Sequence, residues 1–252
     1  MILRRLKAHV EKENWFAVFL DFAIVVIGVF VGLQVANWNE SRAEDRREQL
    51  YLERLDLEFD VVEDRINRAI LAAENGQIAV DQLMKAHAIG PGAFPTPQGK
   101  GPGELFWESV TNVRPATPPA AFKELVASGE LSLLKNEALR AALYEFDSIS
   151  EVSLAVHAAG LNDMEGLRRL FFTAYRFEAE GVHENFNWSP ERFRTGAQRI
   201  SGTFVPEAFF DNPDFLDELN GALIYIANNE VLARQQIELI ERINVLLSEE
   251  LS

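Results

Sequence analysis

The chain has 252 residues, 48% of them apolar and 25% charged, which suits one medium domain or two small ones. Its 39 acidic residues outnumber 24 basic ones, and the net charge of −15 argues against nucleic acid or anionic lipid head groups as the main partner. The chain has no cysteine, which excludes disulfides, thiol catalysis and zinc–thiolate sites.

An apolar stretch near the N-terminus predicts a membrane span. Residues 16–33 contain one strongly polar side chain, Asp21, and tryptophans stand on both sides of the stretch, at Trp15 and Trp38. As a helix, residues 15–38 would be about 36 Å long, enough to cross a hydrocarbon core about 30 Å thick. Tryptophan is typical of both membrane interfaces, so we expect Trp15 and Trp38 to be interfacial anchors.

Two other interpretations of the apolar stretch stay open. Basic residues precede it, as in a secretory signal peptide, although no convincing small-residue cleavage site follows at residues 34–38. A buried helix of a soluble protein is the other alternative, which the length of the stretch disfavours.

The prediction divides the chain into three parts: a short tail over residues 1–14, the transmembrane helix over residues 15–38, and an extramembrane helical domain over residues 39–252. Basic residues are slightly more frequent before the span than just after it, at Arg4, Arg5, Lys7 and Lys12 against Arg42, Arg46 and Arg47. This bias favours a cytoplasmic N-terminus. We therefore expect a single-pass protein of a bacterial inner membrane with its C-terminal domain in the periplasm.

One face of the predicted span is acidic and small. Gly28 and Gly32 form a GxxxG motif, which allows two membrane helices to approach closely, and both return to the direction of Asp21 at 100° per residue. A carboxylate at the bilayer centre costs about 2.5–3.5 kcal/mol on insertion scales. Asp21 is therefore hydrated or protonated at shallow depth, paired with a polar group of a partner helix, or a proton carrier.

Two segments of the chain resemble a known family. The first comprises Ile24-Val25-Val26-Ile27-Gly28, Leu33-Gln34 and Asn37-Trp38-Asn39-Glu40, and the second is ELVASGELSLLKNEALR at residues 124–140. Both resemble a bacterial family of single-span membrane proteins classed only as a domain of unknown function, in which Glu is more usual than Asp at position 21. The resemblance implies a membrane-anchored helical protein and carries no assigned activity.

The rest of the chain predicts an all-α fold, a helical bundle with a Gly/Pro-rich loop at residues 90–103. A long amphipathic helix is expected from Trp38 to about Ala73, where apolar residues recur at intervals of three and four. This repeat is too short for several strict heptads, so it favours a bundle helix over a dimeric coiled coil. Its apolar residues are Leu55, Phe59, Val62, Ile66 and Ile70.

Glycines divide the predicted helices that follow. We expect Gly76 to end the long helix before a short helix at residues 78–88, and Gly160 to end a helix that starts at Asn136. Asn162 and Glu165 then predict the start of another helix over residues 167–179. A helix after Pro119 and one or two helices over residues 216–251 complete the bundle, and no stretch alternates like a strand.

Residues 181–216 combine aromatic side chains with Gly, Asn, Pro and Ser. Aromatics in such a segment either close one end of a bundle or form a recognition surface. The candidate partner surface comprises Phe186, Trp188, Phe193 and Phe204.

No pattern in the chain predicts catalysis, a metal site or a cofactor. Known nucleotide, hydrolase and metalloprotease motifs do not occur, and the four histidines have no second ligand at a suitable spacing: His9, His87, His157 and His183. We therefore expect a membrane-anchored interaction or scaffold module without enzyme activity, an oligomer or an accessory subunit of a larger membrane assembly. The alternatives are a periplasmic ligand-sensing domain that signals through a partner, and a proton-coupled component that uses Asp21.

Overall fold

The computed structural model describes residues 15–91, 101–177 and 202–252. The chain forms two compact units, Met1–Tyr51 and Leu52–Ser252. The boundary falls within helix α2 (Trp15–Ile89), whose first part makes up the described portion of the first unit. In that unit the large apolar side chains are exposed, as at Phe22 (65%) and Ile27 (62%).

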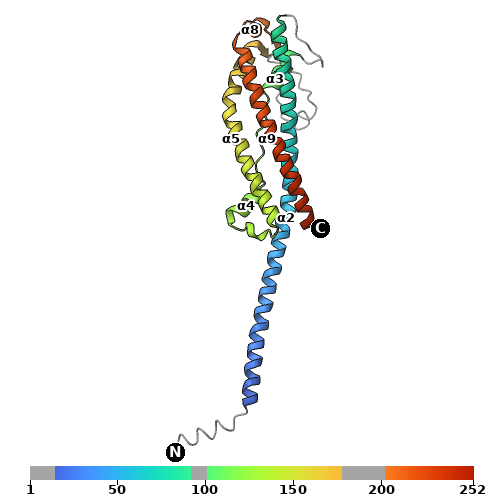
Figure 1. Ribbon diagram of the computed structural model, residues 1–252, viewed down its shortest axis with the longest axis vertical. Helices are drawn as coiled ribbons and strands as arrows, with labels where there is room; N and C mark the ends of the chain where they lie inside the picture. The colour runs from blue at the N-terminus through green and yellow to red at the C-terminus, as the bar shows by residue number, and fades with distance from the viewer. Residues whose placement is uncertain (1–14, 92–100, 178–201) are drawn as a thin grey trace, which may run out of the picture. The chain divides into compact units, whose positions relative to one another are not determined.

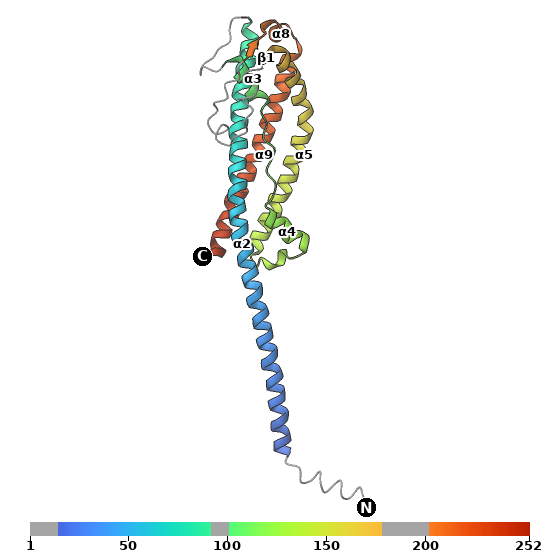
Figure 2. The same cartoon turned by 180° about the vertical axis from the view of Figure 1, so that it is seen from behind.

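The second unit is a bundle of three long helices, which confirms the all-α prediction. Figures 1 and 2 show α2, α5 (Glu137–Ala174) and α9 (Asp214–Leu251) side by side. The shorter elements are α3 (Pro102–Val110), α4 (Ala120–Ser128), the 3₁₀-helix η1 (Leu131–Leu133), β1 (Tyr175–Phe177), β2 (Gly202–Phe204) and α8 (Pro206–Phe210).

The apolar row predicted for the long helix is the core face of α2. Leu55 and Phe59 are fully buried and Ile66 is 1% exposed, because spacings of three and four place them on one side of the helix. Phe59 meets Phe146 of α5 edge to face, with ring centroids 5.4 Å apart.

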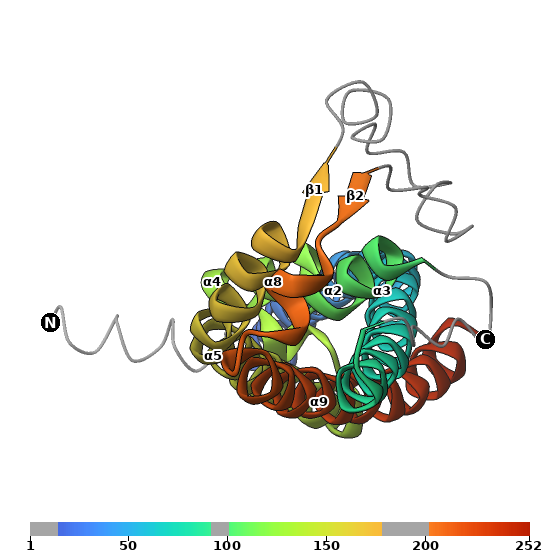
Figure 3. The same ribbon diagram turned by 90° about the horizontal axis from the view of Figure 1, so that it is seen from above.

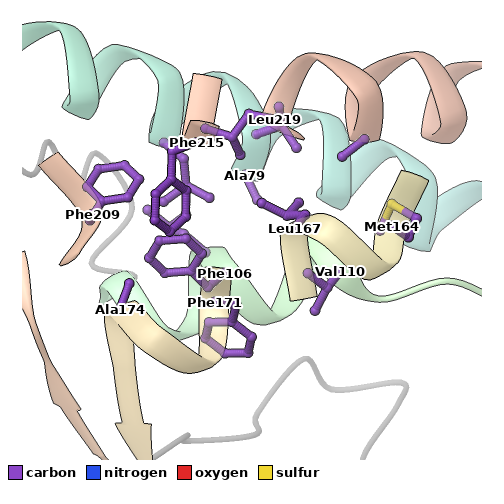
Figure 4. Packing of buried hydrophobic residues seen from close by; sticks show 14 of the residues in the cluster. Ala79, Phe106, Val110, Met164, Leu167, Phe171, Ala174, Phe209, Phe215 and Leu219 are labelled. Atoms are coloured by element: carbon purple, nitrogen blue, oxygen red, sulfur yellow. The ribbon is translucent and has the colours of Figure 1, made fainter. Parts of the chain in front are cut away.

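A second part of the core is rich in phenylalanine. Phe106 of α3 stacks on Phe171 of α5 at 5.2 Å and meets Phe209 of α8 edge to face at 5.4 Å. Phe215 of α9 continues this column, 4.8 Å from Phe209 (Figure 4). The column joins α3, α5 and the consecutive helices α8 and α9.

Two predicted helix breaks are wrong. Helix α2 continues through Gly76 to Ile89, and α5 continues through Gly160 to Ala174. Both glycines lie where a neighbour leaves little room for a side chain. An added Cβ at Gly76 would lie 3.2 Å from the Glu108 carbonyl oxygen and 3.2 Å from Ile226 Cδ1. These glycines therefore serve close packing inside helices instead of ending them.

The short elements α3, η1, β1, β2 and α8 were not predicted. Helix α3 begins directly after the Gly/Pro-rich segment, with Pro102 in its first turn and the Gly101 N–H donating to Glu104 Oε2 at 2.9 Å. The strands β1 and β2 form an antiparallel pair in which Arg176 faces Thr203, and Figure 3 shows them side by side.

The helix start predicted at Asn136 is confirmed, whereas the helix predicted to run to residue 179 ends at Ala174, where β1 follows. Asn136 caps α5, because its Oδ1 accepts a hydrogen bond from the Leu139 N–H at 3.0 Å. Gly129 ends α4 in a left-handed conformation with φ of 73°. Helix α9 is one continuous helix, preceded by a turn in which Asn212 Oδ1 accepts from the Asp214 N–H at 3.0 Å.

Candidate functional site

The apolar stretch is one candidate site. Among the described residues, one helix is long and apolar enough to cross a membrane, and its most apolar 18-residue window has a mean hydropathy of 1.7. None of that window is buried. A core helix of a soluble protein buries its apolar face, so this exposure does not fit the buried-helix alternative.

The predicted packing residues of this stretch have open surroundings. An added Cβ at Gly28 or at Gly32 would meet nothing within 4 Å. Trp38 is 55% exposed, and the Arg42 guanidinium lies 3.9 Å above its ring. Trp15 and Asp21 belong to the helical backbone of α2, but their side chains are outside the described part of the structure.

Of the predicted aromatic surface, the described residues include Phe204 alone. Its ring lies 6.0 Å from that of Phe209 and 6.4 Å from that of Phe106, at the edge of the phenylalanine column. Phe186, Trp188 and Phe193 lie outside the described residues.

A polar cavity in the bundle is a second candidate site, which the sequence did not predict. It measures about 40 Å³ and lies between α2, the connection from α3 to α4, α5 and α9. Apolar residues form most of its lining, among them alanines of α2 and Ile226 of α9. The polar side chains that line it come from the other three segments: Thr111, Asn112, Ser153, Tyr225, Asn229 and Gln236.

Tyr225 and His157 make the central hydrogen bond beside this cavity. The Tyr225 hydroxyl lies 2.8 Å from His157 Nδ1. Burial, helped by the charges of Arg114 and Arg168, lowers the pKa of His157, and burial raises the pKa of Tyr225 to about 12. At neutral pH both groups are therefore neutral, and we assign the hydroxyl as the donor and Nδ1 as the acceptor.

Two buried polar atoms near this pair have no hydrogen-bond partner among the described residues. They are the donor Asn112 Nδ2 and the acceptor Asn229 Oδ1, although Asn229 Nδ2 donates to the Tyr225 carbonyl oxygen at 2.8 Å. A water molecule needs about 10–15 Å³ of such a cavity and some polar partners. The cavity therefore suits about three water molecules and is far smaller than a usual ligand pocket.

Gln236 lines the cavity and forms hydrogen bonds with neighbouring segments of the bundle. Its Nε2 donates to Ser150 Oγ of α5 at 2.9 Å and lies 3.4 Å from the Ala116 carbonyl oxygen. Gln236 and Ser150 are each 1% exposed, and a buried amide without partners would be costly. These contacts fix α9 against α5 and against the connection before α4.

The charged side chains of the bundle form surface pairs between helices. Arg234 of α9 lies 2.6 Å from Glu74 of α2 and 2.7 Å from Glu230, and these hydrogen bonds raise the pKa of the guanidinium. Such exposed pairs contribute little to stability. No group of three potential metal ligands occurs among the described residues.

Comparisons with known proteins do not assign a family. No family model matches the chain, and neither a curated protein nor a solved structure is found to be similar. The resemblance to the family of single-span proteins therefore stays a prediction.

Proposed function

We propose that the protein is a membrane-anchored helical interaction module, an oligomer or an accessory subunit of a larger membrane assembly. One observation carries the proposal: all described large apolar side chains between Phe19 and Val35 are exposed, from 47% at Val26 to 66% at Phe19. A contiguous apolar surface of this size is unfavourable in water and typical of contact with lipid. Residues 15–38 would make that contact.

The anchored chain would lie in a bacterial inner membrane, with the N-terminus in the cytoplasm and the helical bundle in the periplasm. The small excess of basic residues before the span supports this orientation. The net charge of −15 on the whole chain argues against anionic head groups as a binding partner of the bundle.

The surroundings of Gly28 and Gly32 favour a role in helix–helix interaction over a role in catalysis. Gly28 and Gly32 leave open space on a helix that would lie in lipid, where small residues allow a second helix to pack closely. The ligand-sensing alternative has less support, because the polar cavity beside Tyr225 is of a size for water. The proton-coupled alternative depends on Asp21 alone.

Membrane fractionation tests the anchor. The full chain is expected to stay in the membrane pellet after a carbonate wash. A variant with Ile27→Lys and Val31→Lys is expected to leave the pellet, since each lysine at the centre of a span costs about 2.5–3.5 kcal/mol. The matched control is Ile224→Lys with Val231→Lys, two residues of α9 that are similarly exposed, at 63% and 56%.

The control variant should fractionate like the unmodified chain. A soluble, monodisperse chain without detergent, or an Ile27→Lys and Val31→Lys variant that stays in the carbonate pellet, would contradict the anchor. Reporter fusions at the C-terminus, active only in the periplasm or only in the cytoplasm, test the orientation. Purification in mild detergent with mass spectrometry of co-purifying chains tests the interaction, and a clean monomer would count against it.

A further inference from the structure

Tyr225 connects an imidazole of α5 with the polar cavity. Its hydroxyl lies 2.8 Å from His157 Nδ1, and Tyr225 also lines the cavity, together with Asn229 one turn further along α9. Asn229 Oδ1 is a buried acceptor without a hydrogen-bond partner among the described residues. A hydroxyl carries one proton, so Tyr225 can donate either to His157 or towards the cavity, but not to both at once.

The amide of Asn229 is held in the orientation that a second acceptor requires. Its Nδ2 donates to the Tyr225 carbonyl oxygen at 2.8 Å, which leaves Oδ1 as the atom without a partner. About three water molecules fit the cavity that both residues line. Water both donates and accepts, so it can carry a hydrogen bond from the hydroxyl to Asn229 Oδ1.

Protonation of His157 would reverse the hydrogen bond with Tyr225. A neutral imidazole can accept the hydroxyl proton at Nδ1, whereas an imidazolium carries a proton on each nitrogen and can only donate. The Tyr225 oxygen would then accept from Nδ1, and its own proton would need a different acceptor. The cavity offers one.

We propose that His157, Tyr225 and Asn229 form a pH-sensitive switch, here called the hydroxyl relay. In the neutral state the hydroxyl donates to His157 Nδ1, and in the protonated state it donates through water in the cavity to Asn229 Oδ1. The hydroxyl relay thus transmits the protonation of a partly exposed side chain of α5 to a buried amide of α9. It belongs to the helical bundle and does not depend on the proposed membrane anchor.

The charges around His157 determine what protonation does to the bundle. Burial lowers the pKa of His157 most, and the charges of Arg114 and Arg168 lower it further. Neither guanidinium is ion-paired with a carboxylate in the part of the chain that the structure describes. The residues of α2 that line the cavity are apolar, and α9 contributes the neutral Tyr225. A protonated His157 would therefore add a third positive charge, which we expect to weaken the contact of α5 with α9 and with the connection before α4.

Nitrogen NMR of the full chain in mild detergent, with isotope-labelled histidine, tests the hydroxyl relay. The chain has four histidines, so the signal of His157 can be identified by its loss in His157→Asn. In the neutral ring we expect Nδ1 to be the nitrogen without a proton, and a titration gives the proton affinity of the ring. A neutral ring with its proton on Nδ1 would overturn the inference, because the hydroxyl could not then donate to that atom.

Asn229→Leu removes the acceptor that the protonated state uses, without removing either partner of the hydrogen bond between His157 and Tyr225. We expect the proton affinity of His157 to fall about threefold or more, the effect of one lost hydrogen bond. The matched control is Asn228→Leu, at the exposed neighbouring position of α9, which should leave the affinity unchanged. An unchanged or higher affinity in Asn229→Leu would contradict the hydroxyl relay.

A double-mutant cycle separates the hydroxyl relay from a direct effect of Asn229 on the imidazole. Tyr225→Phe lacks the hydroxyl, so the addition of Asn229→Leu to this variant should no longer change the proton affinity of His157. An effect of Asn229→Leu that persists in the Tyr225→Phe background would overturn the inference. Circular dichroism of each variant checks that the bundle is folded.

The weakened contact is measured separately, at Ser153. This residue of α5 lines the cavity and is 2% exposed, and the natural chain has no cysteine, so Ser153→Cys reports opening of the cavity by its rate of reaction with a neutral thiol reagent. Comparison with Ser153→Cys in the His157→Asn background at the same pH cancels the pH dependence of the thiol itself. Below the pKa measured for His157 we expect the ratio of the two rates to rise about threefold or more, again the effect of one hydrogen bond. A ratio that stays constant through the titration would contradict the switch.

Discussion

Gly160→Ala is expected to destabilise the bundle, although alanine is a better helix former than glycine. Gly160 lies inside α5 against the ring of Tyr225, and an added Cβ would lie 2.6 Å from Cε2 of that ring and still closer to Cδ2. Real Cβ atoms essentially never come closer than 3.0 Å to such a neighbour. The ring of Tyr225, which is 5% exposed, would therefore have to move.

The magnitude follows from three contributions. Alanine in place of glycine stabilises a helix by about 1 kcal/mol. Overpacking a core costs about 1–3 kcal/mol, and displacement of Tyr225 would break its hydrogen bond with His157, which costs about 1–3 kcal/mol more if a buried atom is left unpaired. The expected net loss is about 1–5 kcal/mol, a fall in melting temperature of roughly 2–20 °C for a domain of this size.

Thermal unfolding of the full chain in one mild detergent, followed by circular dichroism, measures this loss. Gly221→Ala in α9 is the matched control, because an added Cβ there meets nothing within 4 Å. It should raise the melting temperature by about 2–4 °C, as expected for a helical glycine without close neighbours. A Gly160→Ala variant as stable as the parent chain would refute the reasoning.

Gly166→Ala tests the same reasoning at a position where the neighbouring side chain can move more easily. An added Cβ at Gly166 would meet the carboxylate of Glu218, the end of a flexible side chain that can turn away. We expect its loss of stability to be smaller than that of Gly160→Ala. A larger loss would mean that Glu218 is held in place more firmly than the ring of Tyr225.

Four further predictions concern single side chains. Asn136→Ala removes the cap of α5 and should lower the free energy of unfolding by about 1 kcal/mol in a denaturant titration. The raised pKa of Tyr225, about 12, favours the neutral phenol in the folded state. Its stabilisation, about 3 kcal/mol at most, should be complete below about pH 10 and lost as the pH rises towards 12, and Tyr225→Phe should abolish the tyrosine absorbance change near pH 12. The lowered pKa of His157 has the opposite effect on the pH dependence of folding stability. The stabilisation from neutral His157 should be present above about pH 6.5 and lost as the pH falls through the depressed pKa, so His157→Asn should flatten the stability profile in that pH range. Asp21→Asn keeps the shape of the side chain without its titratable proton, so membrane fractionation should be unchanged, and a change would favour a role for the charge.

Periodicity predicted the parts of the fold that depend on one helix face. Leu55, Phe59 and Ile66 could be assigned to the core because burial on one side of a helix repeats every three or four residues. The two predicted breaks at Gly76 and Gly160 failed for a different reason. A single glycine costs a helix only about 1 kcal/mol, which close packing against Glu108, Ile226 or Tyr225 can offset.

The start of α3 carried a signal that the Gly/Pro-rich composition of residues 90–103 obscured. Pro102 suits the first turn of a helix, and Glu104 can reach back to the Gly101 N–H, so this short stretch read by itself predicts a helix start.

The polar cavity could not have been predicted in this way. Asn112, His157 and Tyr225 come from three segments that are far apart in the sequence, and none belongs to a recognisable motif. Only the packing of α5 against α9 brings His157 to the hydroxyl of Tyr225.

The short strand pair has a practical consequence for experiments in living cells. Phe177 and Gly202 face each other in the antiparallel register, so the two ends of segment 178–201 are held about 5 Å apart by the bundle itself. Each doubling of a loop between fixed ends costs only about 0.6 kcal/mol. A fluorescent protein or epitope tag inserted between these strands should therefore leave the three long helices folded, so that the protein can be followed in the cell with both of its termini unaltered.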